Sequence, residues 1–372
     1  MVLCYAFDSG LLPDSFLALY LATTFLGIFN VGLFSQLSFH FLYKKATFIK
    51  WQYKSNAEFP KAKLVRHEAV RTIQGIFFSA IFPALAIYLA KKKAGGYGAS
   101  DSDQGADSFL ESKVLPKFQG YCGIDSSGEG MIRHLAEMLF IILVTDVYEW
   151  LYHNLGHELD FLWRFHTHHH KFFNPTPWAV IADEPPDQIM RSLPLLVLPF
   201  VFRMNVDVLF FTFAAFFYVY GIYLHSGYEC DWIVRSDNPV VNTSFQHYMH
   251  HYAGGRKHAC HTGFFFKFED WVVGSYYKGD LTMEAQRPYY AINCRKGGKR
   301  KYADWERVAK KFPNYSVMYD WRFWLGEIGV KRYEEYFDRE EVSVVDLTKA
   351  GGYSKEKEID RVRKHVEGAV VE

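Results

Sequence analysis

The sequence has few cysteines and no excess of either charge. Its cysteines are scattered and odd in number, which predicts no disulfide framework. They are Cys4, Cys122, Cys230, Cys260 and Cys294. The lack of paired cysteines also argues against a sulfur-bound structural zinc or an iron–sulfur cluster. The 42 basic and 41 acidic residues leave a formal charge of +1, so nothing in the composition indicates nucleic acid.

Two cofactor signatures are missing as well. The nearest approach to a Gly-x-Gly-x-x-Gly dinucleotide motif, residues 96–101, lacks the last glycine and sits in a polar loop. No haem-binding segment of the fused cytochrome b5 kind is visible. We therefore expect any electrons that the protein uses to come from a separate redox partner.

Long apolar runs, in contrast, are plentiful. Residues 15–43 contain no acid, 69–90 and 135–152 are shorter and less pure, and 188–224 is broken at 203–207. Each approaches the roughly 20 apolar residues that cross a bilayer. The pattern predicts an all-α integral membrane bundle of about four to five spans. The last run forms a hairpin whose first arm is short enough to be re-entrant.

The charges between these runs predict an orientation. Residues 44–67 carry seven basic residues against a single acid, which places them in the cytosol and the N-terminus in the lumen. By the parity of the spans, residues 153 and 225 then also emerge on the cytosolic side. Asp146 and Glu149, near the end of the third span, are expected to face a polar interior such as a metal centre.

Three histidine clusters follow these spans. Positions three and four apart share one face of a helix, so we expect each cluster to aim its imidazoles at one point. Imidazole suits iron, copper, zinc and nickel. One metal could not use so many ligands, whereas two irons could each take four or five nitrogens and keep a position open for dioxygen. Taken singly, such a histidine is more often an interfacial or core residue. The clusters are His153 and His157; His166, His169 and His170; His247, His250 and His251.

The motifs around these histidines resemble the fatty acid hydroxylase superfamily, and look most like its sterol C-5 desaturase branch. The resemblance runs from about Glu149 to Tyr277, roughly a third of the chain. The motifs, in order, are HNLGH, WRFHTHHHKFFNPTP, HSG, NPVVN, QHYMHHYAGG and FFKFEDWVVGS.

The resemblance implies a membrane enzyme of the endoplasmic reticulum, and the orientation predicted from the charges places its histidine-rich cap in the cytosol. It implies a non-haem di-iron centre, dioxygen as oxidant, and cytochrome b5 with its reductase as electron donors. It adds one histidine, His225, to the three clusters. The ligands that it implies are His153, His157, His166, His169, His170, His225, His247, His250 and His251.

The chain departs from the family pattern in several places. Ile181 and Glu184 stand where the desaturase branch usually has histidines, and Glu269-Asp270 replaces a Trp-Asp pair. Glu184 is a possible metal ligand or neighbour of the ligands, although an ordinary loop carboxylate is an equal alternative.

Three further histidines remain possible neighbours of the metals. His168 lies two positions from both His166 and His170, so on a helix it points away from them. His258 and His261 lie just beyond the third cluster, and we expect them to be solvated or to contact lipid headgroups more readily than metal.

Four functions remain open. Sterol desaturation leads, and hydroxylation of a sphingoid base, fatty acyl chain or sterol methyl group is the alternative. A silent lipid-binding scaffold is a non-enzymatic alternative. A histidine-rich metal transporter ranks last, because the histidines cluster just past the ends of the spans. The 34 Phe, 25 Tyr and 9 Trp fit either membrane belts or a flat sterol pocket.

The sequence divides into three regions. These are an anchor over 1–130, a catalytic domain over 131–277 and a polar cytosolic region over 278–372. In the last, the basic stretch 294–301 fits either a docked acidic haem protein or anionic headgroups.

Overall fold

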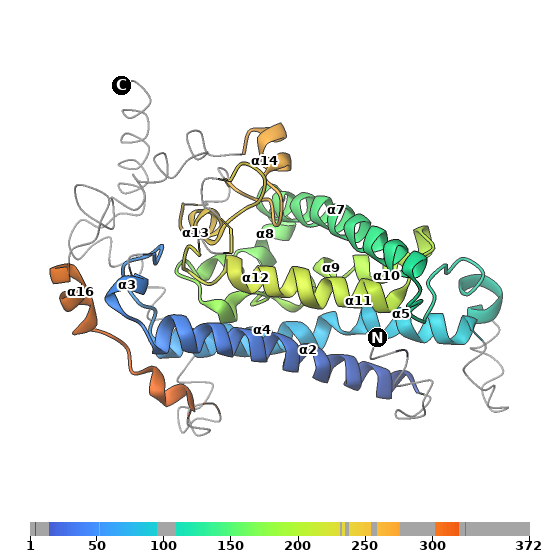
Figure 1. Cartoon of the computed structure of the whole chain (residues 1–372), viewed down its shortest axis with the longest axis horizontal. Helices are drawn as coiled ribbons and strands as arrows, with labels where there is room; N and C mark the ends of the chain where they lie inside the picture. Colours follow the sequence, from blue (N-terminus) through green and yellow to red (C-terminus); the bar gives the residue numbers. More distant parts are fainter. Residues whose placement is uncertain are drawn as a thin grey trace.

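The chain folds as a layered bundle of helices (Figure 1). The structure, a computed structural model, describes Cys4, residues 15–51, 53–94, 109–230, 233–234, 238–253, 259–275 and 302–319, and Trp324. Within these ranges β-structure is limited to isolated bridges. The predicted all-α fold is confirmed.

The helices, with η marking 3-10 or π turns, run in the following order. They are α2 (Phe16–Phe39), η1 (His40–Lys44), α3 (Phe48–Trp51), α4 (Ala62–Ser79), α5 (Ile81–Lys93), η2 (Leu110–Val114), α7 (Gly128–Glu158), α8 (Asp160–His166), η3 (His169–Lys171), η4 (Pro177–Ala179), α9 (Pro185–Arg191), α10 (Pro194–Val201), α11 (Val206–Thr212), η5 (Phe213–Tyr218), α12 (Val219–Leu224), α13 (Ser244–Ala253), α14 (Phe268–Val273), α16 (Tyr302–Ala309) and η7 (Tyr315–Tyr319).

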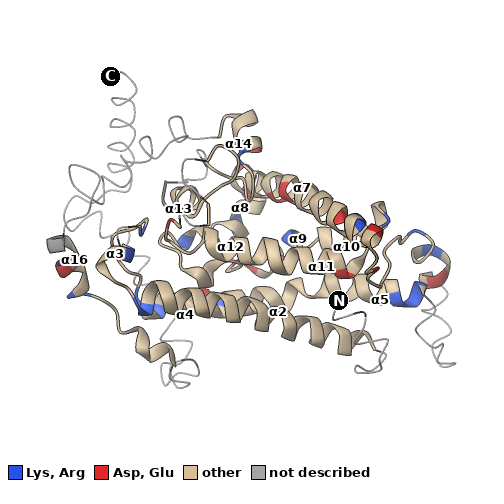
Figure 2. Cartoon of the chain, viewed as in Figure 1, with Lys and Arg blue, Asp and Glu red and all other residues tan. Residues whose placement is uncertain are grey.

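Three helical stretches are long and apolar enough to cross a membrane. They are Phe16–Lys44, Ala62–Lys93 and Val206–Leu224. Helix α2 carries no charge along its length, and charged side chains gather near the ends of the bundle (Figure 2). Large apolar side chains point outward, as in Leu17 and Phe25, which are 64% and 67% exposed. An outward apolar surface of this kind suits lipid as the solvent.

Helix α7 is long enough to span but less apolar, because acids lie within it. Asp146 is buried and accepts hydrogen bonds from the backbone nitrogens of Phe265 (2.6 Å) and Phe266 (3.0 Å). Glu149 pairs with Arg191 across 2.9 Å. The expectation that both acids face a polar interior is confirmed.

The fourth apolar run folds back on itself near residues 202–205. Its first arm is two short helices, α9 and α10, while its second runs through α11, η5 and α12. Asn205 begins the second arm, since its Oδ1 accepts from the backbone nitrogens of Asp207 (2.9 Å) and Val208 (3.2 Å). Such a cap satisfies two nitrogens that the first helical turn leaves without partners.

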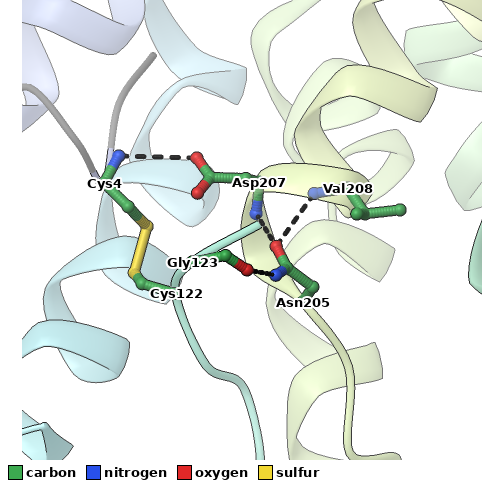
Figure 3. Close-up of a disulfide and its surroundings, with 6 residues drawn as sticks. All are labelled: Cys4, Cys122, Gly123, Asn205, Asp207 and Val208. Carbon is green, nitrogen blue, oxygen red and sulfur yellow. Dashed lines mark hydrogen bonds between the residues drawn. A yellow bond between two sulfur atoms is a disulfide. The ribbon is translucent and has the colours of Figure 1, made fainter. Parts of the chain in front are cut away.

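A disulfide links Cys4 to Cys122, a single bond that the scattered cysteines did not indicate. The pair is 118 residues apart in sequence, a separation that only the folded chain brings together. The backbone nitrogen of Cys4 also donates to Asp207 Oδ1 (3.4 Å), beside the turn at Asn205 (Figure 3). The first described residue is thereby fixed to the loop before α7.

Part of the C-terminal region packs onto the C-terminal end of α2 and onto η1. Tyr315 is buried against Phe39 and Tyr43, with ring centroids 5.0 and 6.2 Å away. Its hydroxyl donates to the carbonyl of Pro60. The basic stretch 294–301 and the proposed boundary at 277/278 lie outside the described residues.

Candidate metal centre

Nine histidines from five segments converge at one end of the bundle. Two come from the end of α7, three from α8 and η3, one follows α12, and three lie on α13. They form two groups, and within each group one nitrogen or more per ring lies within 4.8 Å of the others. The first group is His153, His157, His166, His170 and His250; the second is His169, His225, His247 and His251.

The groups do not follow the sequence clusters. The expectation that each cluster aims at one point holds for α7 alone, since both other clusters divide between the groups. Helical rotation explains the division. At about 100° per residue, position i+4 lies 40° to one side of position i and position i+3 lies 60° to the other. His247 and His251 therefore share a group, while His250 belongs to the other.

Several rings are held through their Nδ1 atoms. Three of these atoms lie 2.8 Å from backbone carbonyl oxygens: His153 from Thr262, His225 from Gly221, and His250 from Cys260. A carbonyl oxygen only accepts hydrogen bonds, so each Nδ1 carries the proton and each Nε2 presents a lone pair.

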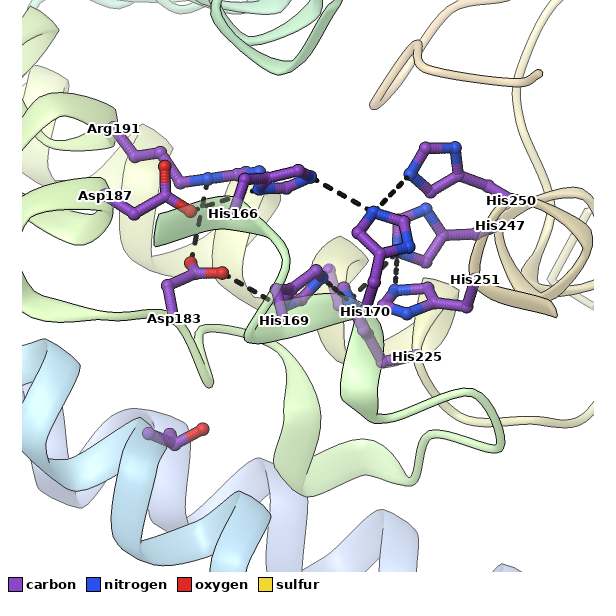
Figure 4. Close-up of polar contacts among 12 residues, drawn as sticks. His166, His169, His170, Asp183, Asp187, Arg191, His225, His247, His250 and His251 are labelled. Carbon is purple, nitrogen blue, oxygen red and sulfur yellow. Dashed lines mark hydrogen bonds and ion pairs between the residues drawn. The ribbon is translucent and has the colours of Figure 1, made fainter. Parts of the chain in front are cut away.

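Two more rings are held by carboxylates. His166 Nδ1 lies 3.1 Å from Asp187, and His169 Nδ1 lies 2.9 Å from Asp183 (Figure 4). Tyr152 donates to the same Asp187 at 2.6 Å. Carboxylates behind metal-binding imidazoles orient the ring and raise its basicity.

In the rings held through Nδ1, the Nε2 atoms face other histidines at close range. His225 Nε2 is 3.3 Å from His169 Nε2, although both rings direct their protons elsewhere. His247 Nε2 approaches His225 Nε2 to 2.9 Å. His153 Nε2 is buried with no hydrogen-bond partner among the described residues. Converging lone pairs repel unless a cation lies between them, so this donor set fits metal binding.

The surroundings keep these rings neutral. Burial, followed by repulsion from His169, lowers the pKa of His225 to about 3. Burial and then His169 and His247 hold the pKa of His251 well below its usual value. For Asp183, burial is opposed by His169 and Arg191, which together lower its pKa. Neutral imidazole is the form that binds metal.

Sequence reasoning missed Asp183, Asp187 and Arg191. All three are buried or half-buried, and Arg191 lies between the carboxylates of Glu149 (2.9 Å) and Asp183 (3.6 Å). The spacing of four residues between Asp187 and Arg191 was an available signal, because it places complementary side chains on one face of α9. Asp183 precedes this helix and gave no such signal.

Two of the less certain candidates lie outside both groups. His168 is 40% exposed and contacts Glu184 at 2.8 Å, and Glu184 also pairs with Arg71 at 3.2 Å. Ile181 is buried in an apolar cluster with Val31 and Ile76. The two places where the family pattern has histidines therefore do not face the histidine groups.

His261 is buried, with 1% exposed, so the expectation that it is solvated is wrong. Its backbone nitrogen donates to Ser275 (3.1 Å), and its φ of 54° marks a tight turn after α13. The neighbouring Asp270 accepts from Thr262 and Gly263, which fixes this turn beside His153 and His250. His258 lies outside the described residues.

Comparison with known proteins agrees with this geometry. Residues 138–275, the stretch that carries all nine histidines, match the fatty acid hydroxylase family. This region belongs to that family. The predicted resemblance is therefore confirmed.

Parts of the chain are also similar to individual enzymes. A Delta(7)-sterol 5(6)-desaturase of Leptosphaeria maculans is 26% identical over 241 residues, 63% of this chain and 56% of the relative. One from Eremothecium gossypii is 31% identical over 131 residues, 35% of this chain and 36% of the relative. The lathosterol oxidase of Homo sapiens is 27% identical over 192 residues, 50% and 61% of the two chains. The chain spans about half the length of these relatives, and no solved structure matches it.

Proposed function

We propose that this protein is a membrane-bound non-haem di-iron oxidoreductase that desaturates a sterol with dioxygen and externally supplied electrons. The observation that carries the proposal is the pair of adjacent histidine groups, one of five and one of four rings. Each offers enough nitrogens for one iron, and the nine histidines act as the ligands. Bound iron would supply the activation of dioxygen.

The residues around the groups prepare them for this role. Asp187 and Asp183 orient His166 and His169, and Arg191 balances the charge of the second carboxylate. The carbonyls of Thr262 and Cys260 orient His153 and His250. Such outer partners hold the ligands in place before metal binds, which reduces the reorganisation needed on binding.

The sterol is supported by the relatives, whose names specify oxidation of sterols. Hydroxylation of a lipid is the second candidate, favoured by the family that the region matches. A silent scaffold has less support, since Ile181 and Glu184, the departures that motivated it, leave both histidine groups complete.

The disulfide supports the predicted orientation. Disulfides persist in oxidising compartments such as the lumen of the endoplasmic reticulum. Cys4 and Cys122 lie by the turn of the hairpin, whereas His225 follows its opposite end. We therefore place the bond in the lumen of the endoplasmic reticulum and the histidines in the cytosol, where cytochrome b5 and its reductase would supply electrons.

Metal analysis of histidine variants tests the centre. The purified protein should hold two irons per chain, and His169→Ala or His250→Ala should lose metal because each removes a ligand from a different group. His168→Ala is the matched control, since this ring points to Glu184. Equal metal content in all three variants would refute the assignment.

Expression in a cell that lacks its own C-5 desaturase tests the reaction. A restored 5(6) double bond, lost again in His169→Ala, supports sterol desaturation. A new hydroxylated lipid instead would assign the protein to the second candidate, and an unchanged lipid profile would contradict both.

A further inference from the structure

Two cavities follow one another from the middle of the bundle toward the histidine groups. The larger, about 280 Å³, lies among α2, the junction of α4 with α5, and the second arm of the hairpin. The smaller, about 40 Å³, lies among α7, α9 and η5. Phe213 and Tyr218 line both, so their rings form a shared wall.

The larger cavity suits an apolar body. Most of its walls are apolar, as at Leu26, Ile76, Phe210 and Ala214, and it lies along the apolar stretches that are long enough to span a membrane. Polar atoms enter the walls at Thr23, Asn30, Ser79 and Asp207. Gly27 also lines the cavity and lets α2 approach α4 closely, because a Cβ there would come within 2.9 Å of Ile76. Its volume is near the lower end of the roughly 300–1,000 Å³ typical of ligand pockets.

The smaller cavity reaches the residues that support the metal centre. Glu149 and Arg191 line it, and Arg191 contacts Asp183, the partner of His169. Ile181, where the family pattern has a histidine, supplies an apolar part of the wall. The cavity exceeds the roughly 10–15 Å³ that one water needs, so it admits a hydroxyl group.

A neutral polar atom beside this small cavity has no hydrogen-bond partner among the described residues. Gln188 lines the cavity and is 2% exposed, and its Oε1 is buried without a hydrogen-bond partner among the residues that the structure describes. Glu149 and Arg191 also line the cavity and bind each other, while Arg191 Nε makes no hydrogen bond among the described residues and lies 3.6 Å from Asp183. A buried amide oxygen is costly to leave without a donor. The oxygen can only accept, so its missing partner is an O–H or N–H group.

We propose that the two cavities form one binding site for a neutral lipid with a single hydroxyl, and that Gln188 Oε1 accepts the hydroxyl hydrogen. The apolar body extends past Phe213 and Tyr218 into the larger cavity. This assignment deepens the proposed function and rests on it for the sterol. In a 3-hydroxysterol the hydroxyl carbon is two bonds from C-5, so a hydroxyl held at Gln188 would place C-5 beside the small cavity, next to Arg191 and the residues that support His169.

Binding also needs a movement of the shared wall. A volume of about 40 Å³ holds the hydroxyl but not the ring that bears it. Phe213 or Tyr218 must therefore turn aside when the lipid enters. A free carboxylate or a bulky phosphate headgroup fits poorly, because it would meet the Gln188 oxygen and the Glu149 carboxylate and needs more room.

Equilibrium binding of radiolabelled lathosterol and its 3-deoxy analogue, cholest-7-ene, tests the hydroxyl contact. Wild type in nanodiscs should bind lathosterol roughly tenfold more tightly than the analogue, as expected for one buried hydrogen bond. Gln188→Met, which keeps the length of the side chain, should remove that preference while retaining metal. Equal binding of the two lipids by wild type would overturn the proposal, even if the variant fails to fold.

A matched pair of tryptophan variants tests the larger cavity. Ala214→Trp fills it, whereas Ala215→Trp places the same ring on the neighbouring residue of η5, which does not line either cavity. We expect at least tenfold weaker lathosterol binding for the first variant and unchanged binding for the second. Equal effects of the two would overturn the assignment.

These measurements separate the two proposals because binding needs no turnover. A protein that oxidises sterols but shows neither the hydroxyl preference nor the Ala214→Trp effect keeps its function and loses this site. A protein that shows both effects but oxidises nothing keeps the site and loses the function.

Discussion

At the residue scale, the Nδ1 atoms that bind carbonyls or carboxylates say as much about the histidine groups as the Nε2 atoms that face one another. Carbonyls hold His153, His225 and His250, while carboxylates hold His166 and His169. The helices determine the position of each imidazole. These acceptors determine which of its two nitrogens faces the other histidines. The proposed centre therefore depends on groups behind the ligand rings, which are three backbone carbonyls and two carboxylates.

The first prediction at this scale concerns Asp187. Asp187→Asn should weaken iron binding about 10- to 100-fold, because the amide supports the His166 Nδ1 proton less well and no longer raises the basicity of the ring. Chelator competition measures the affinity. Glu184→Gln, the same exchange at a carboxylate that contacts His168 and Arg71, should leave it unchanged. Equal losses in both variants would contradict the specific role of Asp187.

The sequence predicts which histidines come together but not how they divide between the two groups. Motif spacing identifies His247, His250 and His251, yet their division between two groups needs the direction from which each partner helix approaches. His261 shows a second limit. Its burial results from a turn held by Asp270 eight or nine residues away, which no local pattern indicates.

At the scale of elements, α7 connects the membrane region to the loop behind the histidines. Asp146 lies on α7 about two turns before His153 and receives the backbone nitrogens of Phe265 and Phe266. The same loop supplies the Thr262 carbonyl to His153. One buried acid thus aligns a helix and a loop that hold the same ring.

Removing this acid should loosen the centre without removing a ligand. Asp146→Ala leaves two backbone donors unsatisfied and should lower the free energy of unfolding by roughly 2–6 kcal/mol. Metal loss followed on heating should occur at lower temperature. Asp146→Asn keeps one acceptor oxygen and should be intermediate, while exposed Glu129→Ala on the same helix should match wild type. An Ala variant as stable as wild type would disprove this role.

The extents of the elements were partly readable from sequence. The apolar runs predicted α2, α4 with α5, and the break in the hairpin. The first arm of that hairpin is two helices separated at Ser192 and Leu193, since Pro194 lacks the N–H that continuous helix needs.

At the scale of the whole molecule, the two ends of the bundle differ in chemistry. One end gathers neutral imidazoles that fit metal binding, and the other carries a disulfide. The membrane would separate a reducing compartment from an oxidising one along the same axis. The number and spacing of the cysteines did not indicate this pairing, because it depends on how α2, α4 and α5 return the chain to the same end of the bundle.

Labelling in sealed microsomes tests this arrangement. In a background with Cys230→Ser, Cys260→Ser and Cys294→Ser, a membrane-impermeant maleimide should label Asp160→Cys and should reach Ser126→Cys only after detergent is added. Both positions are exposed in the structure, so protection reports the membrane and not burial. Labelling of Ser126→Cys in intact vesicles would contradict the orientation.

The link between Cys4 and Cys122 also imposes an order of assembly. A growing chain presents its N-terminal part first, so both sulfurs are made before any of the nine histidines. Closing a ring of more than 100 residues removes about 4–5 kcal/mol of unfolded-chain entropy. The ring encloses α2, α4 and α5, so these helices can be joined while the later ones are still being synthesised. The helices that carry the histidines would then fold against α2, α4 and α5. These three helices line one side of the larger cavity, so that side would form before the histidines come together.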